Sequence, residues 1–306
     1  MTPQQKLQAI RKTLNHEQIT KGDEVVFFCP RCNHHKPKLS VNLLTEIFHC
    51  WICDWKGKNI APLLEKNSKE KQEYIEELKE KSLTPVAKQE KKYDPLVLPI
   101  EFKTLSKEWS GPYYKAAVRY LSERGIERED ILKWKLGYCE DGDYKYRIII
   151  PSFDDYGHLN FFTGRAFYDN NPKKYKNGNF CKDIIFNDYL IDWNKPITIT
   201  EGPFDAFKIS KNAIALQGST LSYRSKLFSK IVLSGVDVHF AMDTDAFEKQ
   251  LDIIDNFLSY GVTCHYVNLN GKKDVGEMTK SEFDTVASRS IEIKSDLDIL
   301  RMRARV

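Results

Sequence analysis

The sequence contains no run of eighteen apolar residues, and its first residues, MTPQQKLQAIRKTL, lack the apolar core of a secretory signal. We therefore expect no membrane span and a cytoplasmic protein. The sequence also lacks a Walker phosphate loop and any internal repeat. The formal net charge is only +4 over 306 residues, so a polyanionic partner would have to be bound by locally concentrated basic residues.

Cysteine is present but in a pattern that does not suit a disulfide framework. Of seven cysteines, three are scattered, and four form the pairs Cys29-x-x-Cys32 and Cys50-x-x-Cys53. Each pair closes a tight turn that brings two thiolates together, and two such turns complete a tetrahedral zinc site. The histidines His34, His35 and His49 are alternative ligands, but four thiolates already fill the coordination shell. We expect an all-cysteine structural Zn²⁺ site in a small zinc ribbon.

Aromatic and basic residues surround the second cysteine pair. His49, Trp51 and Trp55 lie within six residues of Cys50 or Cys53, and several lysines flank them. Aromatic faces can stack on unpaired bases while lysines contact phosphates, so these three residues are candidates for recognition of a single-stranded nucleic acid. The alternative is that the aromatic side chains fill the core of a very small domain.

Composition divides the chain into parts of different character. The segment 67–95 is rich in Lys and Glu and poor in apolar residues, which favours a flexible charged linker, and the spacing of Glu and Lys also allows a solvated helix in part of it. Strand and helix patterns alternate over 196–270, which predicts a parallel sheet with helices packed on it. The predicted domains are a zinc-binding domain (1–66), the linker (67–95), an α+β basic subdomain (96–195), an α/β subdomain (196–280) and a C-terminal tail (281–306).

Acidic residues follow the strands predicted in the α/β part. Glu201 follows the strand 197–200, Asp243 and Asp245 follow the strand 238–242, and Asp274 comes after the strand 262–269. In an open α/β sheet, sites form beyond the carboxyl ends of the strands, so these carboxylates should converge. Carboxylate oxygens suit Mg²⁺ or Mn²⁺ and phosphate chemistry.

The strand followed by Glu201-Gly202 and the strand followed by Asp243-Thr244-Asp245 resemble the Toprim domain. An ordered series of further motifs resembles bacterial and bacteriophage DNA primases: Tyr120–Ile126, Arg147–Pro151, Gly164-Arg165, Lys173–Tyr175, Cys181–Phe186 and Ala215–Leu221. The resemblance implies acid–base chemistry or metal binding for Glu201 and magnesium binding for Asp243 and Asp245. Asp274 matches a further acidic position, and Asp205 fits the stretch that follows the glutamate.

Four basic residues of the middle segment are candidates for binding nucleotide or template: Arg147, Arg165, Lys174 and Lys182. Arginine forks match phosphate oxygens, so we expect these side chains to face a triphosphate and a template across from the carboxylates. The alternative for any one of them is an ordinary surface charge.

The resemblance implies a DNA-directed RNA polymerase that joins ribonucleoside triphosphates into short primers on a single-stranded DNA template. The size suits a stand-alone bacteriophage primase whose replicative helicase is a separate chain. Two other classes stay open at this point. One is a non-catalytic repair mediator with a zinc fold and a Toprim domain, and the other is a Toprim nuclease or topoisomerase.

Overall fold

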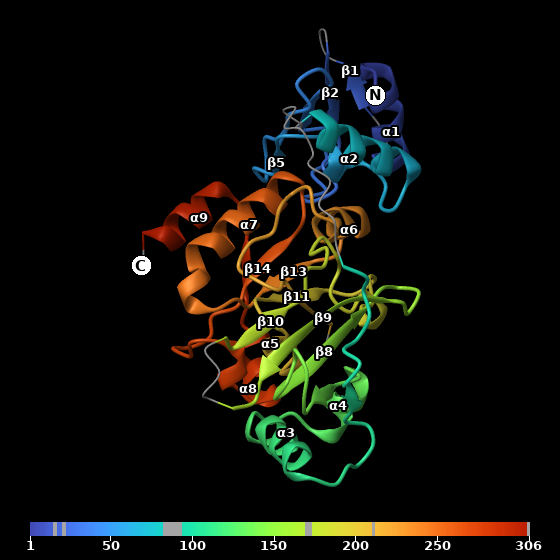
Figure 1. Ribbon diagram of the computed structural model, residues 1–306. Coiled ribbons are helices and arrows are strands. Elements are labelled where there is room, and N and C mark those ends of the chain that lie inside the picture. The colour runs from blue at the N-terminus through green and yellow to red at the C-terminus, as the bar shows by residue number, and fades with distance from the viewer. Residues whose placement is uncertain (15–16, 20–22, 82–93, 169–172, 210–211, 305–306) are drawn as a thin grey trace.

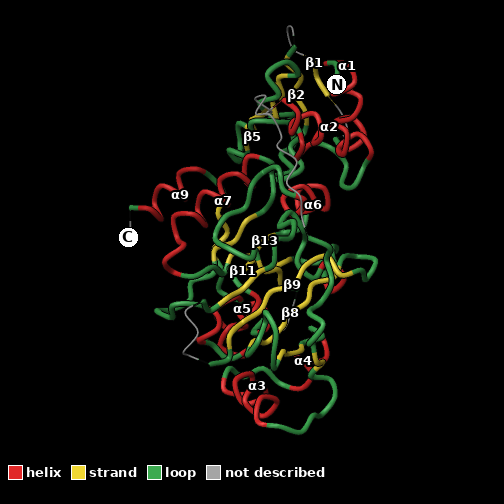
Figure 2. The backbone as a smooth tube through the Cα atoms, viewed as in Figure 1, coloured by secondary structure: helices red, strands yellow, loops and turns green. Residues whose placement is uncertain are grey.

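Three sheets follow one another along the chain in the computed structural model shown in Figure 1. The structure describes residues 1–304 except 15–16, 20–22, 82–93, 169–172 and 210–211. Each sheet has five strands in the described part of the chain. The tube in Figure 2 shows the three sheets arranged from one end of an elongated molecule to the other. Among the described residues, no helix combines the length and the apolar character needed to cross a membrane.

The first sheet forms the zinc module and is antiparallel, with its strands in sequence order. Alternate residues of β2 and β3 are buried, including Val25, Phe27, Leu39 and Val41, as the two-residue period of a strand requires. Helix α1 begins at a capping box between Thr2 and Gln5. The elements are α1 (Pro3–Thr13), β1 (Glu17–Ile19), β2 (Glu24–Phe27), β3 (Leu39–Asn42), β4 (Phe48–Cys50), β5 (Lys56–Gly57) and η1 (Ala61–Leu63).

The segment predicted as a flexible linker begins with a packed helix, α2 (Lys69–Lys81), and the prediction is wrong for this part. Tyr74 and Ile75 are buried, and the Tyr74 hydroxyl donates to the carboxylate of Glu46, which also pairs with the buried Lys6. The prediction used the composition of the whole segment, in which these few apolar residues have little weight, although they lie on one face of the helix. Residues 82–93 of the expected linker lie outside the described residues.

The second sheet is also antiparallel and has the order β10-β9-β8-β7-β6. Its two long central strands, β8 and β9, form a hairpin around the turn at Gly157. The strand β8 is buried from Arg147 to Ser152. The elements are β6 (Lys103–Thr104), α3 (Pro112–Glu123), α4 (Arg128–Lys133), β7 (Gly137–Cys139), β8 (Arg147–Phe153), β9 (Leu159–Ala166), β10 (Tyr175–Asn177) and η2 (Asp188–Leu190).

The third sheet has the order β12-β11-β13-β14-β15, and its first four strands are parallel. With the cysteine module and the α+β subdomain, this sheet confirms the predicted fold class. Its elements are β11 (Ile197–Thr200), α5 (Pro203–Phe207), β12 (Ala213–Ala215), α6 (Lys226–Ser234), β13 (Val238–Phe240), η3 (Thr244–Ala246), α7 (Phe247–Ser259), β14 (Cys264–Tyr266), η4 (Val275–Glu277), α8 (Lys280–Ala287), β15 (Ile291–Ile293) and α9 (Asp296–Arg303).

The C-terminal segment, predicted as a tail, contributes a strand to the third sheet. Strand β15 pairs antiparallel with β14, and α9 packs along α7, where Arg303 bonds to Glu248 and Asp252. The short strand Ile291–Ile293 escaped prediction because a three-residue edge strand carries little periodic signal.

The zinc module packs against the loops that lead into β13 and β14. Asn59 Nδ2 donates to the carbonyl of Ser259 at 3.0 Å, and Lys66 Nζ donates to the carbonyl of Gly235 at 2.7 Å. Arg31 pairs with Glu292 of β15 at 2.7 Å. The module therefore lies at the amino-terminal edge of the parallel strands, which is the edge opposite to the one that carries the predicted carboxylates.

Candidate functional site

The acids predicted after β11 and β13 converge at the carboxyl edge of the third sheet. Ligand oxygens of Glu201, Asp243 and Asp245 all lie within 4.8 Å of one another. Glu201 directly follows β11, and the two aspartates lie at the start of η3, so neighbouring parallel strands deliver them to one place. Three carboxylates at this separation have the donor chemistry and spacing of a divalent-cation site.

Burial and neighbouring negative charges disfavour the ionised forms of Glu201 and Asp243. Burial and neighbouring carboxylates, of which Asp205 acts most strongly, raise the pKa of Asp243 to about 7. Burial and the charge of Asp245 also raise the pKa of Glu201, whereas Lys249 opposes the shift. Like charges that share a site disfavour ionisation, and a bound cation would relieve that repulsion.

Asp274 lies outside the cluster of three, although it was predicted as a further metal ligand. Its carboxylate accepts the backbone N–H of Glu277 at 3.1 Å, and its charge contributes to the raised pKa of Asp205 and Asp243. Asp274 therefore stands close to the acids as a neighbouring charge, while its oxygen caps the short helix η4.

Asp205 joins the two loops that frame the cluster. Its carboxylate accepts the backbone N–H of Gly202 at 3.2 Å and that of Gly276 at 3.0 Å. Burial and the charge of Asp274 raise its pKa to about 6. These bonds fix the loop after Glu201 against the loop after β14, so Asp205 positions the site.

Sequence reasoning missed Lys249, the cation that faces the cluster. Its charge lowers the pKa of Glu201, and its ammonium donates to the hydroxyl of Ser219 at 2.8 Å. Lys249 follows Asp245 by four residues at the start of α7, so the two lie on one side of the helix entry. The four-residue spacing from Asp245 was the sequence signal that could have identified Lys249.

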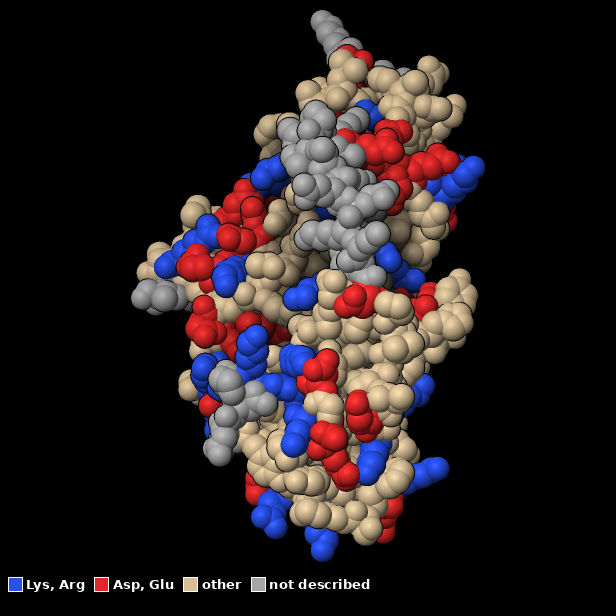
Figure 3. Space-filling view, in the orientation of Figure 1, with Lys and Arg blue, Asp and Glu red and all other residues tan. Residues whose placement is uncertain are grey.

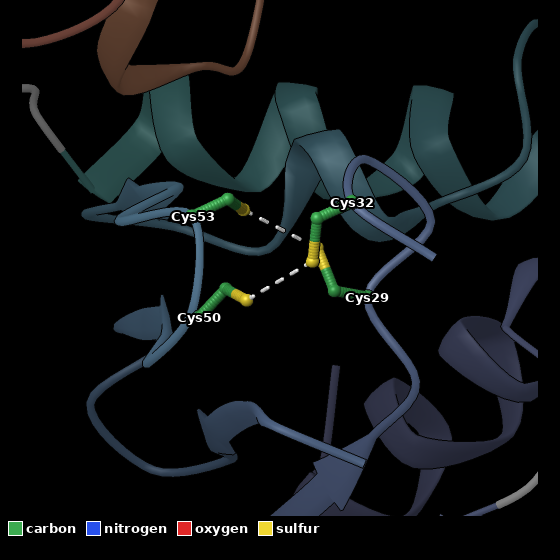
Figure 4. A group of neighbouring side chains, drawn as sticks. All are labelled: Cys29, Cys32, Cys50 and Cys53. Atoms are coloured by element: carbon green, nitrogen blue, oxygen red, sulfur yellow. Dashed lines mark hydrogen bonds between the residues drawn. The ribbon is translucent and has the colours of Figure 1, made fainter. Parts of the chain in front are cut away.

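The four predicted cysteines form one cluster, and Figure 4 shows their side chains pointing toward one another from two loops. The sulfurs of Cys29 and Cys53 are 3.7 Å apart, and those of Cys32 and Cys50 are 3.8 Å apart. A tetrahedron with zinc–sulfur bonds of about 2.3 Å has edges of about 3.8 Å. The spacing therefore fits a structural zinc ion.

The two cysteine turns have the same backbone form. The N–H of Asn33 donates to the carbonyl of Cys29, and the N–H of Asp54 donates to the carbonyl of Cys50, each at 3.0 Å. Asn33 and Asp54 have positive φ of 46° and 58°, a conformation that Asn and Asp tolerate well. Local sequence is thus sufficient to build each half of the site.

An aromatic and basic face lies beside the cysteine site on the outer side of the module sheet. Trp51 is 70% exposed, and its ring meets that of His49 edge to face at 4.5 Å. Lys56 lies directly across from His49 on β5. We call Lys38, His49, Trp51 and Lys56 the aromatic face. Trp55 packs edge-on against Phe48 at 4.9 Å because neighbouring strand residues point to opposite sides.

Arg147, predicted to contact nucleotide or template, has a different environment in the structure. The residue is buried, and its guanidinium donates to the backbone carbonyls of Gly164, Lys173 and Lys174 at 3.2, 2.9 and 3.3 Å. A buried guanidinium needs acceptors, and these carbonyls supply them. Arg147 therefore anchors the segment that leads into β10 and also lines a surface cavity with Lys173 and Lys176, and its contact with nucleotide or template stays a prediction.

Arg165 lies close to the acidic loop. Its Nε donates to the Tyr120 hydroxyl at 2.8 Å, and its guanidinium lies 4.7 Å from the ring centre of Tyr175 and 5.7 Å from that of Phe204. Phe204 follows Glu201 by three residues, so Arg165 reaches the side of the carboxylate cluster. These contacts of its guanidinium are therefore with aromatic residues of the described part of the chain.

Lys174 and Lys182 are exposed, and they lie in different places. Lys174 precedes β10, whereas Lys182 lines a cavity beside the loop after β12. Figure 3 shows Lys and Arg side chains gathered over the part of the molecule that contains β10, with acidic side chains next to them. The four predicted basic residues therefore do not form a single cluster.

Comparison with known proteins identifies relatives that are DNA primases. No protein-family model matches the chain. The DNA primase of Thermotoga maritima is 25% identical over 85% of this chain, and that of Campylobacter jejuni is 25% identical over 71%. The chain resembles bacterial DNA primases. This finding confirms the resemblance predicted from the motifs.

The fold agrees with the sequence comparison. The crystal structure of the Aquifex aeolicus primase, containing zinc-binding and RNA polymerase domains, matches 98% of this chain and 88% of its own with a TM-score of 0.51 at 20% identity. The likeness therefore extends from the cysteine module to the third sheet. The chain spans about half the length of the curated relatives, 55% and 44% of the two primases named above.

Proposed function

We propose that this chain is a DNA primase, a nucleotidyltransferase that makes short RNA primers on single-stranded DNA from ribonucleoside triphosphates. The observation that carries the proposal is the cluster of Glu201, Asp243 and Asp245 at the carboxyl edge of a parallel sheet, in a chain whose relatives are primases. This function would place the protein in the cytoplasm, where it would act in DNA replication. A separate replicative helicase completes the proposal as a partner.

The carboxylates would hold Mg²⁺ or Mn²⁺, which would ease deprotonation of the attacking 3′-hydroxyl and stabilise the departing pyrophosphate. Glu201 lies at the end of β11, where its raised pKa suits it to accept a proton from that hydroxyl. Asp205 keeps the loop after Glu201 in place through Gly202 and Gly276. Lys249 adds a positive charge beside the site.

The aromatic face of the zinc module would bind the template. Trp51 offers a base a largely exposed ring, while Lys38 and Lys56 are placed to contact phosphates. The four thiolates would hold Zn²⁺ and thereby fix the loop on which Trp51 lies. Since the module packs at the edge opposite the carboxylates, the proposal includes that it either leaves this packing or serves a neighbouring copy of the chain.

The test is primer synthesis on single-stranded DNA with ribonucleotides and Mg²⁺, with and without a candidate helicase. Glu201→Gln and Asp243→Asn should abolish product, while Asp155→Asn, an exposed turn residue, should not change it. Absence of any oligoribonucleotide under all these conditions would count against the proposal. Nicking of supercoiled DNA instead would point to a nuclease.

Mixing two inactive variants separates the two routes for the zinc module. Cys29→Ser removes the module's metal and Asp243→Asn removes a carboxylate, and each variant leaves the other site intact. If the module serves a neighbouring copy, the mixture regains synthesis. If each module serves its own chain, the mixture stays inactive.

A further inference from the structure

A cavity of about 370 Å³ lies beside the loop that follows β12, the strand that pairs with β11. It is bounded by the segment 182–184, the loop after β12 and the start of α6. The loop touches the acidic site directly, because the N–H of Gly218 donates to the backbone carbonyl of Glu201 at 3.4 Å and Ser219 accepts from Lys249. We call this cavity the loop pocket.

The polar lining of the loop pocket consists mainly of hydrogen-bond donors. Lys182 and Arg224 supply two positive charges, and Gln217, Thr220 and Ser222 add an amide and two hydroxyls. The one acid in the lining is Asp183, and its carboxylate accepts the backbone N–H of Lys226 at the start of α6 at 2.8 Å. A pocket with two cations, several neutral donors and an engaged carboxylate favours an anion.

One hydrogen-bond donor of the Gln217 side chain lacks an acceptor among the described residues. This donor is Nε2, which is buried. The residue also has a positive φ of 60°, which is uncommon for a residue other than glycine. A buried donor without an acceptor costs free energy unless something pairs with it, so it marks the place where an acceptor is missing. Oxygens of a phosphate would supply that acceptor.

We propose that the loop pocket binds the 5′-phosphates of the nucleotide that begins the primer. This inference rests on the proposed function. Joining two nucleoside triphosphates releases pyrophosphate from one of them, while the other donates its 3′-hydroxyl and keeps its own triphosphate. That second triphosphate needs a cationic site separate from the metal-binding carboxylates. With its 3′-hydroxyl beside Glu201, the starting nucleotide would direct its 5′ end into the adjoining pocket.

The first test measures binding of inorganic tripolyphosphate by calorimetry without added divalent cations, conditions in which the carboxylates repel the ligand. Wild-type protein should bind, and Arg224→Ala and the near-isosteric Gln217→Glu should weaken binding at least about tenfold. Lys226→Ala removes an exposed lysine at the start of α6, outside the pocket lining, and should leave binding unchanged. Asp243→Asn removes a repelling carboxylate and should not weaken binding. Binding that is unchanged in both pocket variants, or that requires Mg²⁺, would overturn the proposal.

The second test separates a starting nucleotide from a template phosphate. Dinucleotide synthesis is compared for a starting triphosphate and for the same nucleoside without 5′-phosphates. Arg224→Ala should raise KM about tenfold for the triphosphate and leave KM for the nucleoside and the affinity for single-stranded DNA unchanged. If Arg224→Ala weakens the affinity for single-stranded DNA and leaves both KM values unchanged, the pocket binds the template and the proposal is wrong. If the wild type makes no dinucleotide yet binds tripolyphosphate through Arg224, the primase function fails and phosphate binding stands.

Discussion

The cysteine site and the carboxylate site differ in how far apart their ligands lie in the sequence and in what their charges cost. Four thiols come from two matched turns, and pairs of their sulfurs already lie 3.7 and 3.8 Å apart. The carboxylates come from the ends of two strands that meet only in the folded sheet, and crowding raises the pKa of Asp243 to about 7. Local turns build the first site, whereas sheet register builds the second.

The largest expected effect concerns the cysteine site. Cys29→Ser should abolish stoichiometric zinc binding and unfold the module, because apparent zinc-binding free energies of about 10–16 kcal/mol are also folding free energies in such small domains. Zinc content and limited proteolysis measure the two losses. Cys181→Ser changes an exposed cysteine outside the cluster and serves as the control. A serine variant that keeps its zinc and resists protease would contradict a four-thiolate site.

Asp243→Asn should have opposite effects on activity and on stability, which distinguishes the carboxylate site from the cysteine site. Primer synthesis should fall at least about 100-fold, since a metal ligand contributes several kcal/mol to the transition state. Without Mg²⁺, the free energy of unfolding should rise by about 1 kcal/mol because a repelled carboxylate is removed. Urea unfolding with and without Mg²⁺ measures the second effect. Loss of stability without metal would show that Asp243 is structural.

Metal affinity at the carboxylate site should depend on pH near neutrality. The pKa of Asp243 is raised from 3.8 to about 7, so its carboxyl group keeps a proton below pH 7 that a metal ion must displace. The apparent Kd for Mn²⁺ should rise about tenfold from pH 8 to pH 6. In metal-free protein, this group lowers stability as pH rises from about 4 to 7, because the native state binds the extra proton. An Asp243→Asn variant with the same pH dependence would refute the assignment.

The smallest effects separate two tryptophans of the zinc module. Trp51→Ala should weaken single-stranded DNA binding by about 1–3 kcal/mol, the contribution of one stacked base, and leave stability unchanged. Trp55→Ala should lower the free energy of unfolding by about 2 kcal/mol because its ring packs against Phe48. Fluorescence anisotropy and urea unfolding measure the two quantities. If both substitutions weaken DNA binding equally, the prediction that only the Trp51 side of the module sheet binds DNA is wrong.

Several features of the site could be predicted from local patterns. The spacing of Cys29, Cys32, Cys50 and Cys53 predicts their cluster because a tight turn fixes the separation of its own two thiols. The acids were found because each follows an apolar strand, and parallel strands end at a common edge. The ordered motifs predicted the resemblance that the comparisons confirm.

Other features depended on surfaces that are remote in the sequence. An arginine at the start of a strand gives the same sequence pattern in two cases. Its guanidinium can contact a ligand, or it can donate to backbone carbonyls, as that of Arg147 does to three of them. The packing of α2 through Tyr74 depends on Glu46, and the place of β15 depends on β14. Lys249 gains its role only beside Glu201.

The sequence by itself determined the four cysteine ligands, the convergence of Glu201, Asp243 and Asp245, and the parallel strands that carry these acids, because turn geometry and periodicity act over a few residues. Only the tertiary structure decided that the zinc module packs at the amino-terminal edge of the third sheet, opposite the carboxylates. It also placed the loop pocket beside the loop that follows β12, which bonds to the backbone of Glu201. Both arrangements arise from contacts between segments far apart in the chain, for which no local pattern carries a signal.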